Sequence, residues 1–263
     1  DAVVTTYFHG GAAEGLRAPG SPPMICWDRD QGFARQLWAD LADVIVPKSL
    51  ENHEQAALLD LAGPFGIEVK LRRPRLAPRD EDVEAARSRL ARLGLKPGAY
   101  IAAHVDGPPG SWKAWPPEHF AELLPALSRR SGLPVVSVGS PEGAKLCPPG
   151  TFAHSLHGQL EPGELASVLK NSALCLGPDS GPQHLAQAVG ARTLVLFGPT
   201  AEWRWGPMPR LAGEQGPLPF VTVRASDAPQ DWLEEETGGF APDEHMRRLR
   251  PERVLEAAMG MLG

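Results

Sequence analysis

The residues best suited to chemistry lie in one short stretch, Leu174 to Ala186. Its apolar start predicts a strand, its small residues a turn, and its remainder a helix. In open α/β sheets, ligands bind beyond the carboxyl ends of strands, where a new helix presents unpaired N–H groups to an anion. Asp179, Ser180 and His184 would stand at that point, and Gly181 would let a ligand approach the backbone. The stretch therefore predicts a binding site for a phosphate-bearing ligand.

A structural interpretation of the same residues stays open. Asp179 or Ser180 can simply cap the helix, and Pro182 is tolerated in the first turn because its missing N–H would have had no partner there. An isolated histidine in a first helical turn, such as His184, is more often structural than catalytic. Spacing alone does not decide between a ligand site and a capped helix.

Two further segments strengthen the functional interpretation. A second apolar run ends in the same manner at Gly198, Pro199 and Thr200, and two adjacent strand ends with turn residues favour a ligand crevice. Lys113 follows another predicted strand, from where its ammonium can reach a diphosphate as a point charge. The alternative for Lys113 is a solvated side chain beside two packing tryptophans.

The elements that would position these residues alternate between strand and helix, which favours a doubly wound parallel sheet. We predict strands at 100–104, 135–139, 152–155, 174–176 and 193–197, and helices at 117–130, 161–170, 182–189 and 251–262. The segment from Phe197 to Pro242 is rich in Gly, Pro and Trp and shows little periodicity, so it is expected to be irregular.

The preceding part of the chain alternates less regularly. We predict strands at 2–4 and 44–46, helices at 31–41 and 51–62, and a loop at 10–23. A basic stretch broken by prolines, Arg72 to Arg79, precedes a charged helix at 80–93. The expected domains are therefore a partial first domain, residues 1–78, and a second domain, residues 79–250; the final helix, 251–263, can pack back on the first.

Composition excludes several classes of protein. A net charge of −6 over 263 residues gives no general attraction to nucleic acid or to an anionic membrane. The three cysteines lie far apart without CxxC spacing, which suggests neither a disulfide framework nor a zinc site and favours a reducing cytoplasm. No apolar run approaches the roughly 18 to 20 residues of a membrane span, so any membrane contact is expected to be peripheral.

Taken in order, three motifs resemble the heptosyltransferases of glycosyltransferase family 9. They are Lys-x-Trp-Pro-x-Glu at 113–118, Gly-x-Asp-Ser-Gly-Pro-x-His-Leu-Ala at 177–186, and Leu-Phe-Gly-Pro-Thr at 196–200. A weaker resemblance reaches back to His53 and forward to the last helix. The resemblance implies an α/β protein of the GT-B fold, with two Rossmann-like doubly wound domains and the donor nucleotide bound mainly by the second.

The resemblance also implies an activity, namely inverting, metal-independent transfer of a sugar from a nucleotide donor. In this family the donor is typically ADP-heptose and the acceptor lipopolysaccharide core, so we expect no cofactor beyond the nucleotide-sugar co-substrate. By motif, Lys113 would contact the donor phosphate, Asp179 the donor sugar, and the turn from Ser180 to His184 the diphosphate. Such an enzyme would be cytoplasmic, or peripheral on the inner face of the membrane.

The chain departs from the family pattern in two places. Asp1 to Thr6 resembles a later strand of the first domain, whereas the family usually begins with a Gly-Asp loop that holds the acidic residue thought to deprotonate the acceptor. We therefore expect the first domain to be incomplete at its N-terminus, with the general base in the missing segment. The loop His104 to Gly110 also lacks the usual Ser or Thr. Two rivals remain: a non-catalytic protein on the GT-B fold that binds a sugar nucleotide or glycan, and a nucleotide-sugar epimerase or hydrolase.

Overall fold

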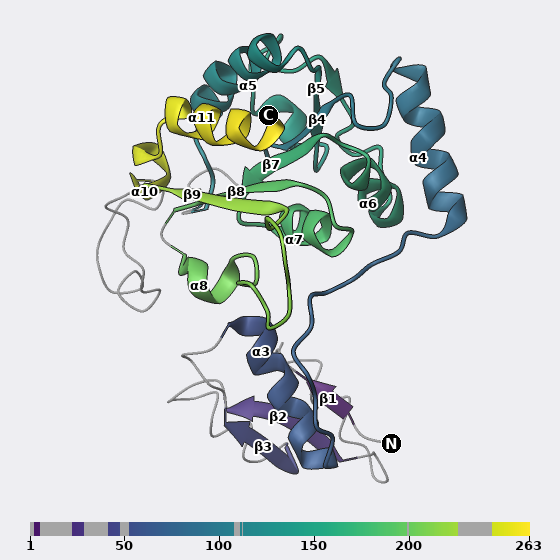
Figure 1. Ribbon diagram of the computed structural model, residues 1–263, viewed down its shortest axis with the longest axis vertical. Coiled ribbons are helices and arrows are strands. Elements are labelled where there is room, and N and C mark those ends of the chain that lie inside the picture. Colours follow the sequence, from purple (N-terminus) through teal and green to yellow (C-terminus); the bar gives the residue numbers. More distant parts are fainter. Residues whose placement is uncertain are drawn as a thin grey trace. The chain divides into compact units, whose positions relative to one another are not determined.

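The computed structural model divides the chain into two compact units, Asp1–Arg72 and Arg73–Gly263 (Figure 1). It describes residues 3–5, 23–28, 42–47, 53–107, 111, 113–198, 200–225 and 244–263. The division lies a few residues before the boundary that the proline-rich stretch suggested. The segment that follows Arg72 therefore belongs with the second unit, where the Leu76 backbone N–H donates to the Ala188 carbonyl at 2.8 Å.

The first unit contains a small parallel sheet. Its strands are β1 (Val3–Thr5), β2 (Met24–Asp28) and β3 (Val44–Pro47), with β2 in the centre. Helix α3 (Glu54–Leu59) continues into the 3-10 helix η1 (Asp60–Phe65), which replaces the single helix expected at 51–62. Ala57 and Leu61 of these helices pack with Ile25 of β2. The sequence patterns did not predict β2, and the expected helix 31–41 lies outside the described residues.

The second unit is built on a sheet of six parallel strands in the order β6-β5-β4-β7-β8-β9. They are β4 (Ile101–His104), β5 (Val135–Val138), β6 (His154–Ser155), β7 (Leu174–Pro178), β8 (Thr193–Phe197) and β9 (Phe220–Arg224). From β4 the chain winds outward to β6, then returns to β7 and winds outward the other way. The strand order therefore reverses between β4 and β7, where doubly wound sheets place their ligands.

Helices cover both faces of this sheet (Figure 1). One face packs against α5 (Pro117–Ser131), α10 (Glu244–Arg248) and α11 (Pro251–Leu262), and the other against α4 (Asp80–Arg92), α6 (Pro162–Lys170) and α7 (Gly181–Ala188). Alternate residues of β4 point to opposite faces of the sheet. Ile101 and Ala103 pack in the hydrophobic core beneath α5 and α11, and Ala102 packs in the core beneath α4 and α6. The result is a three-layer α/β/α arrangement.

Within the described residues of the region expected to be irregular, Phe197 to Pro242, the structure contains two elements. They are α8 (Glu202–Trp205) and β9, which forms the edge of the sheet. The prediction for this region was wrong at β9, because a short, half-exposed edge strand buries too few side chains to leave a strong hydrophobic pattern. The last helix, α11, lies in the second unit and packs on α5.

None of the helices in the described part of the chain combines the length and apolar character that a membrane crossing requires.

Candidate functional site

The sequence-predicted chemistry gathers in a cavity of about 520 Å³ at the carboxyl ends of β4 and β7. We call it the carboxyl-edge cavity. Its lining includes Asp106 and Lys113 from the segment after β4, Ser140 after β5, and Asp179 and Ser180 after β7. The cavity thus lies where the strand order reverses, and its volume falls within the roughly 300–1,000 Å³ of ligand pockets.

Asp179 is the centre of the polar contacts in this cavity. Its carboxylate accepts a hydrogen bond from Lys113 Nζ at 2.7 Å and lies 3.4 Å from His184 Nε2. The Thr200 hydroxyl donates to the same carboxylate at 3.4 Å. The Asp179 side chain is 3% exposed and that of Lys113 is 34% exposed, so the cation is the more accessible of the two partners.

The surroundings of Asp179 keep it ionised. Burial alone would raise the pKa of this carboxyl, but the hydrogen bond from His184 and the charge of Lys113 outweigh burial and hold the pKa below its ordinary value. Lys113 Nζ also lies 6.0 Å from the centre of the Trp205 ring, at the outer limit for a cation–π contact. The site therefore holds a buried anion under a half-exposed cation.

A second polar cluster forms the adjoining wall of the cavity. The Asp106 carboxylate accepts from the Ser140 backbone N–H, and it lies 3.3 Å from His157 Nδ1 and 3.8 Å from His104 Nε2. The other ring nitrogen of His104, Nδ1, lies 3.1 Å from the Ser180 hydroxyl. Burial lowers the pKa of His104, His157 acts in the same direction, and Asp106 opposes them. His104 therefore favours its neutral form.

Two glycines differ in what they do at this edge. A Cβ at Gly177 would come within 2.7 Å of the His104 carbonyl oxygen, so Gly177 is required for the close approach of β7 to β4. A Cβ at Gly181 would meet nothing within 4 Å. Gly181 opens α7, and Ser180 precedes it as the N-cap residue, so the first turn of the helix faces open space beside Asp179.

Most of the predicted site residues come together in the structure. Lys113, Asp179 and Ser180 line the cavity, while His184 and Thr200 contact Asp179. Gly181 and Pro182 form the first turn of α7 beside them.

Gly198 follows β8 directly, whereas Pro199 lies outside the described residues. Five polar lining residues were not predicted as site residues: His104, Asp106, Ser111, Ser140 and Glu142. His104 ends β4 and the others follow β4 or β5, so their position at the ends of predicted strands was the signal available in the sequence.

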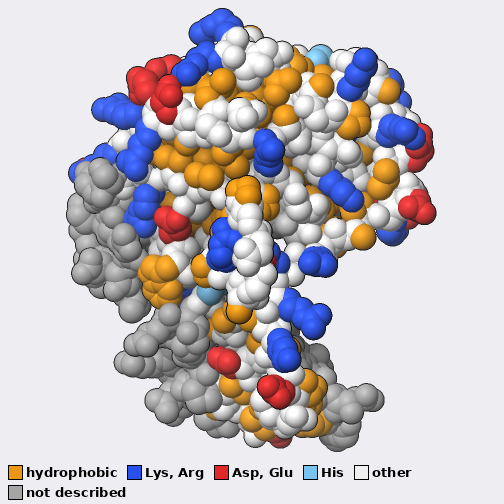
Figure 2. Space-filling view, viewed as in Figure 1, with side chains coloured by type: hydrophobic (Ala, Val, Ile, Leu, Met, Phe, Trp, Pro, Cys, Tyr) orange, Lys and Arg blue, Asp and Glu red, His pale blue; other side chains and the backbone are white. Residues whose placement is uncertain are grey.

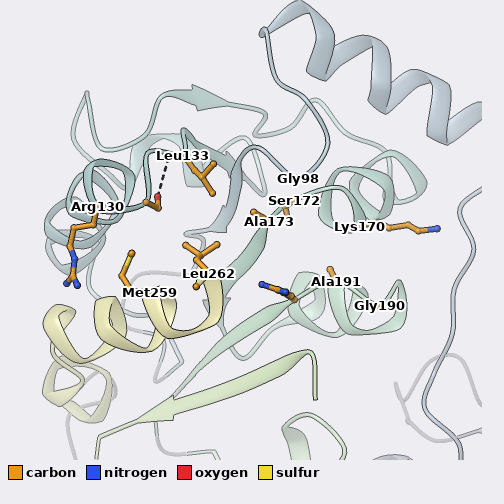
Figure 3. A pocket seen from close by; sticks show the side chains of 13 residues that line it. Gly98, Arg130, Leu133, Lys170, Ser172, Ala173, Gly190, Ala191, Met259 and Leu262 are labelled. Carbon is orange, nitrogen blue, oxygen red and sulfur yellow. Dashed lines mark hydrogen bonds between the residues drawn. The ribbon is translucent and has the colours of Figure 1, made fainter. Parts of the chain in front are cut away.

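A second cavity, of about 620 Å³, lies at the opposite edge of the same sheet (Figure 3). We call it the amino-edge cavity, because Gly98, Ala173 and Arg192 of its lining precede β4, β7 and β8. Met259 and Leu262 of α11 give it an apolar side (Figure 3). Figure 2 shows one face of the molecule, where Lys and Arg side chains of the second unit lie among hydrophobic side chains. Among the described lining residues of this cavity there is no Asp, Glu or His side chain.

Comparison with known proteins gives one family. The family model described as glycosyltransferase family 9 (heptosyltransferase) matches residues 16–215. Lipopolysaccharide heptosyltransferase 1 of Pseudomonas aeruginosa is 28% identical over 169 residues, which are 63% of this chain and 39% of that protein. Lipooligosaccharide heptosyltransferase 2 of Campylobacter jejuni is 26% identical over 180 residues, 65% of this chain and 50% of that protein. The matched regions thus span at most half of these relatives.

Solved structures agree on the fold. The structure of a family 9 glycosyl transferase from Veillonella parvula superposes with a TM-score of 0.76 at 17% identity, and the match covers 100% of this chain and 73% of that chain. ADP-heptose lipopolysaccharide heptosyltransferase II of E. coli gives a TM-score of 0.71 at 17% identity, covering 100% of this chain and 76% of that chain. The α/β fold of this chain is therefore the GT-B fold expected from the motifs.

Proposed function

This chain belongs to glycosyltransferase family 9, the heptosyltransferases, and we propose that its carboxyl-edge cavity binds the nucleotide-sugar donor of a glycosyl transfer. One observation carries the proposal. A buried, ionised Asp179 and a half-exposed Lys113 meet at the first turn of α7, where the strand order of the sheet reverses. That position combines a cation, a helix N-terminus and a hydrogen-bond acceptor in one cavity.

The three parts suit two groups of such a donor. The ammonium of Lys113 and the Gly181 N–H at the start of α7 would hold the diphosphate, whose negative charge favours both. The carboxylate of Asp179 would accept hydrogen bonds from sugar hydroxyls, because its lowered pKa keeps it ionised. Gly181 would let the diphosphate approach the backbone, since the space around its Cα is open.

The proposed reaction is an inverting transfer without a metal ion. A hydroxyl of the acceptor attacks the anomeric carbon of the donor sugar, the bond from that carbon to the diphosphate oxygen breaks, and the acceptor proton passes to a base. Negative charge grows on the departing nucleoside diphosphate. Lys113 and the N-terminus of α7 would stabilise that charge, and such preorganised groups are often the largest contribution to catalysis. We assign no general base.

The proposed substrates rest on the names of the relatives and not on the geometry of the cavity. The names of the relatives specify lipopolysaccharide and lipooligosaccharide, and that of the E. coli structure specifies ADP-heptose. We propose an ADP-linked heptose as donor and a lipopolysaccharide-type glycan or glycolipid as acceptor. An acceptor of that kind would bring the enzyme to the inner face of the membrane, where we propose at most peripheral contact.

Calorimetric titration with ADP, UDP, GDP and their sugar conjugates tests the donor site directly. We expect saturable binding of one nucleotide and weaker binding by Lys113→Ala and by Asp179→Ala. Circular dichroism spectra and thermal midpoints show whether each variant is folded. Absence of binding by the folded wild-type protein would refute the donor site, and equal affinity in all three proteins would refute its assigned residues.

A glycosyl transfer assay separates this proposal from its rivals. With donor and a glycolipid acceptor, a transferase releases one nucleoside diphosphate for each sugar transferred. A hydrolase releases the nucleoside diphosphate without an acceptor. An epimerase changes the sugar while the sugar stays attached to the nucleotide. Tight nucleotide binding with none of these products would indicate a non-catalytic binding protein.

A further inference from the structure

Arg73, the first residue of the second unit, makes an extensive set of contacts for a linker residue. Its guanidinium donates from Nε and Nη2 to the two carboxylate oxygens of Glu214, at 2.6 and 2.7 Å. It also donates to the carbonyls of Met208 and Pro209, at 2.7 and 2.8 Å. The same group lies over the Phe220 ring, 4.9 Å from its centre. A bidentate pair with two carbonyl contacts and a ring is a fixed geometry that a lysine cannot reproduce.

All of these partners lie between α8 and the start of β9. We call the intervening segment, Gly206 to Pro219, the α8–β9 segment. Apart from Gly206 and Met208, which are buried, the segment is exposed or half-buried. Glu214 organises its centre, because the carboxylate that pairs with Arg73 also accepts from the Leu211 backbone N–H at 2.8 Å. Arg73 therefore contacts the beginning and the middle of this segment and, at Phe220, the first residue of the strand that follows it.

The beginning of the segment adjoins the proposed donor site. Gly206 directly follows Trp205, the last residue of α8, and the Trp205 ring is the one that faces Lys113 Nζ. α8 is also tied to β9, since the Thr222 hydroxyl donates to the Glu202 carboxylate. A displacement of the α8–β9 segment would therefore move the ring beside the cation that we assign to the diphosphate.

We propose that Arg73 is a positioning residue of the donor site, which holds the α8–β9 segment and thereby places Trp205 beside Lys113. This role rests on the proposed function, because it presumes that Lys113 binds the donor. Arg73 itself touches neither Lys113 nor Asp179 in any contact that the structure describes; its effect passes through the segment and α8. Arg73 would thus determine the position of the Trp205 ring at one side of the proposed ligand site.

The test combines hydrogen exchange with nucleotide titration on the full chain. In Arg73→Ala, we expect amide exchange across the α8–β9 segment to accelerate about tenfold or more, because its main anchor is gone. The affinity for the nucleotide that the wild type binds should fall about three- to tenfold. Arg73→Lys keeps the charge but loses the bidentate geometry, so it should recover only part of both effects.

A matched control distinguishes the anchor from any lost arginine. Arg130 makes an exposed ion pair with Glu256 at 2.6 Å on the surface of the same unit. Arg130→Ala should leave both the exchange of the α8–β9 segment and the nucleotide affinity unchanged. Equal effects of Arg130→Ala and Arg73→Ala would overturn the assignment.

Trp205 supplies a measurement that general destabilisation would not change. If Arg73 acts through the ring, Arg73→Ala should weaken binding much less in a Trp205→Ala background than in the wild type. Full additivity of the two substitutions would overturn the role, as would wild-type affinity in Arg73→Ala. Failure of the wild-type protein to bind any nucleotide would instead remove the donor site itself, and the role of Arg73 with it.

Discussion

The carboxyl-edge and amino-edge cavities of the second unit occupy opposite edges of one sheet and differ in chemistry more than in size. The amino-edge cavity is the larger, about 620 Å³ against about 520 Å³. Its lining combines apolar side chains with the cations Arg130, Lys170 and Arg192. The carboxyl-edge cavity instead brings a lysine, carboxylates and a histidine together. Volume therefore does not identify the ligand site here.

The difference follows from the winding of the chain. At the carboxyl edge, the segments after β4 and β7 diverge toward opposite ends of the sheet and leave a crevice lined by turns. At the amino edge, helices end and strands begin; the amino-edge cavity includes Gly190, with φ +77°, which follows α7. One edge presents the starts of helices to a ligand, and the other presents their ends.

Substituting one lysine in each cavity is expected to give the largest contrast. Lys113→Ala should lower the affinity for the nucleoside diphosphate about 10- to 100-fold, because charged hydrogen bonds contribute about 1.5–3 kcal/mol. Lys170→Ala removes the same side chain from the amino-edge cavity and should leave the affinity unchanged. Isothermal titration of both variants makes the measurement. A larger loss of affinity in Lys170→Ala than in Lys113→Ala would show that the nucleotide binds at the amino edge instead.

Substituting one glycine at each edge should separate binding from stability. Gly190→Ala forces an alanine to φ +77° and should lower the free energy of unfolding by about 1–2 kcal/mol without changing nucleotide affinity. Gly181→Ala meets no neighbour, so the fold should tolerate it, but the methyl group would obstruct the approach of a diphosphate. Urea unfolding and calorimetry on both variants are needed. Identical behaviour of the two would contradict the contrast.

The smallest expected effect is a pH dependence from the carboxyl edge. Burial lowers the pKa of His104 in the folded protein, so the unfolded chain binds the proton more tightly. The resulting contribution to stability is fully present above the ordinary histidine pKa of 6.5 and is lost as the pH falls through the lower folded-state pKa. His104→Gln should therefore lose less stability than the wild type between about pH 7.5 and about pH 5.

The pH series has a natural control in Lys170→Ala, which should keep the wild-type slope in urea unfolding. Some dependence should also persist in His104→Gln, because burial lowers the pKa of His119 as well. An unchanged slope in His104→Gln would show that His104 does not contribute.

Regular hydrophobic patterns were sufficient for most of the second unit. β8 and α11 occur where the sequence predicted them, at Thr193–Phe197 and Pro251–Leu262, because each combines a continuous apolar pattern with a Gly or Pro at its boundary. β2 and β9 were missed. Each is a five-residue strand directly preceded by a proline, Pro23 or Pro219, and tertiary pairing rather than local pattern decides such strands.

The motifs predicted that the candidate residues lie at the carboxyl ends of strands, where Asp179 and Ser180 are found, but they did not reveal the contacts of these residues. Turn residues and helix start signals located Asp179 and Ser180, since these depend on local sequence. The approach of Lys113 to Asp179, 66 residues apart in the chain, and the cluster around Asp106 depend on which strands are neighbours in the sheet. A single sequence does not specify that order.

The anchored position of Arg73 has a consequence for exchanging parts between related proteins. A chimaera that joined the second unit of this chain to another first half at the proline-rich stretch, after residue 78, would replace Arg73 and leave Glu214 without its guanidinium partner. A junction before Arg73 would transfer the anchor and the segment it holds together. The exchangeable module therefore begins at a single arginine rather than at the first helix of the domain.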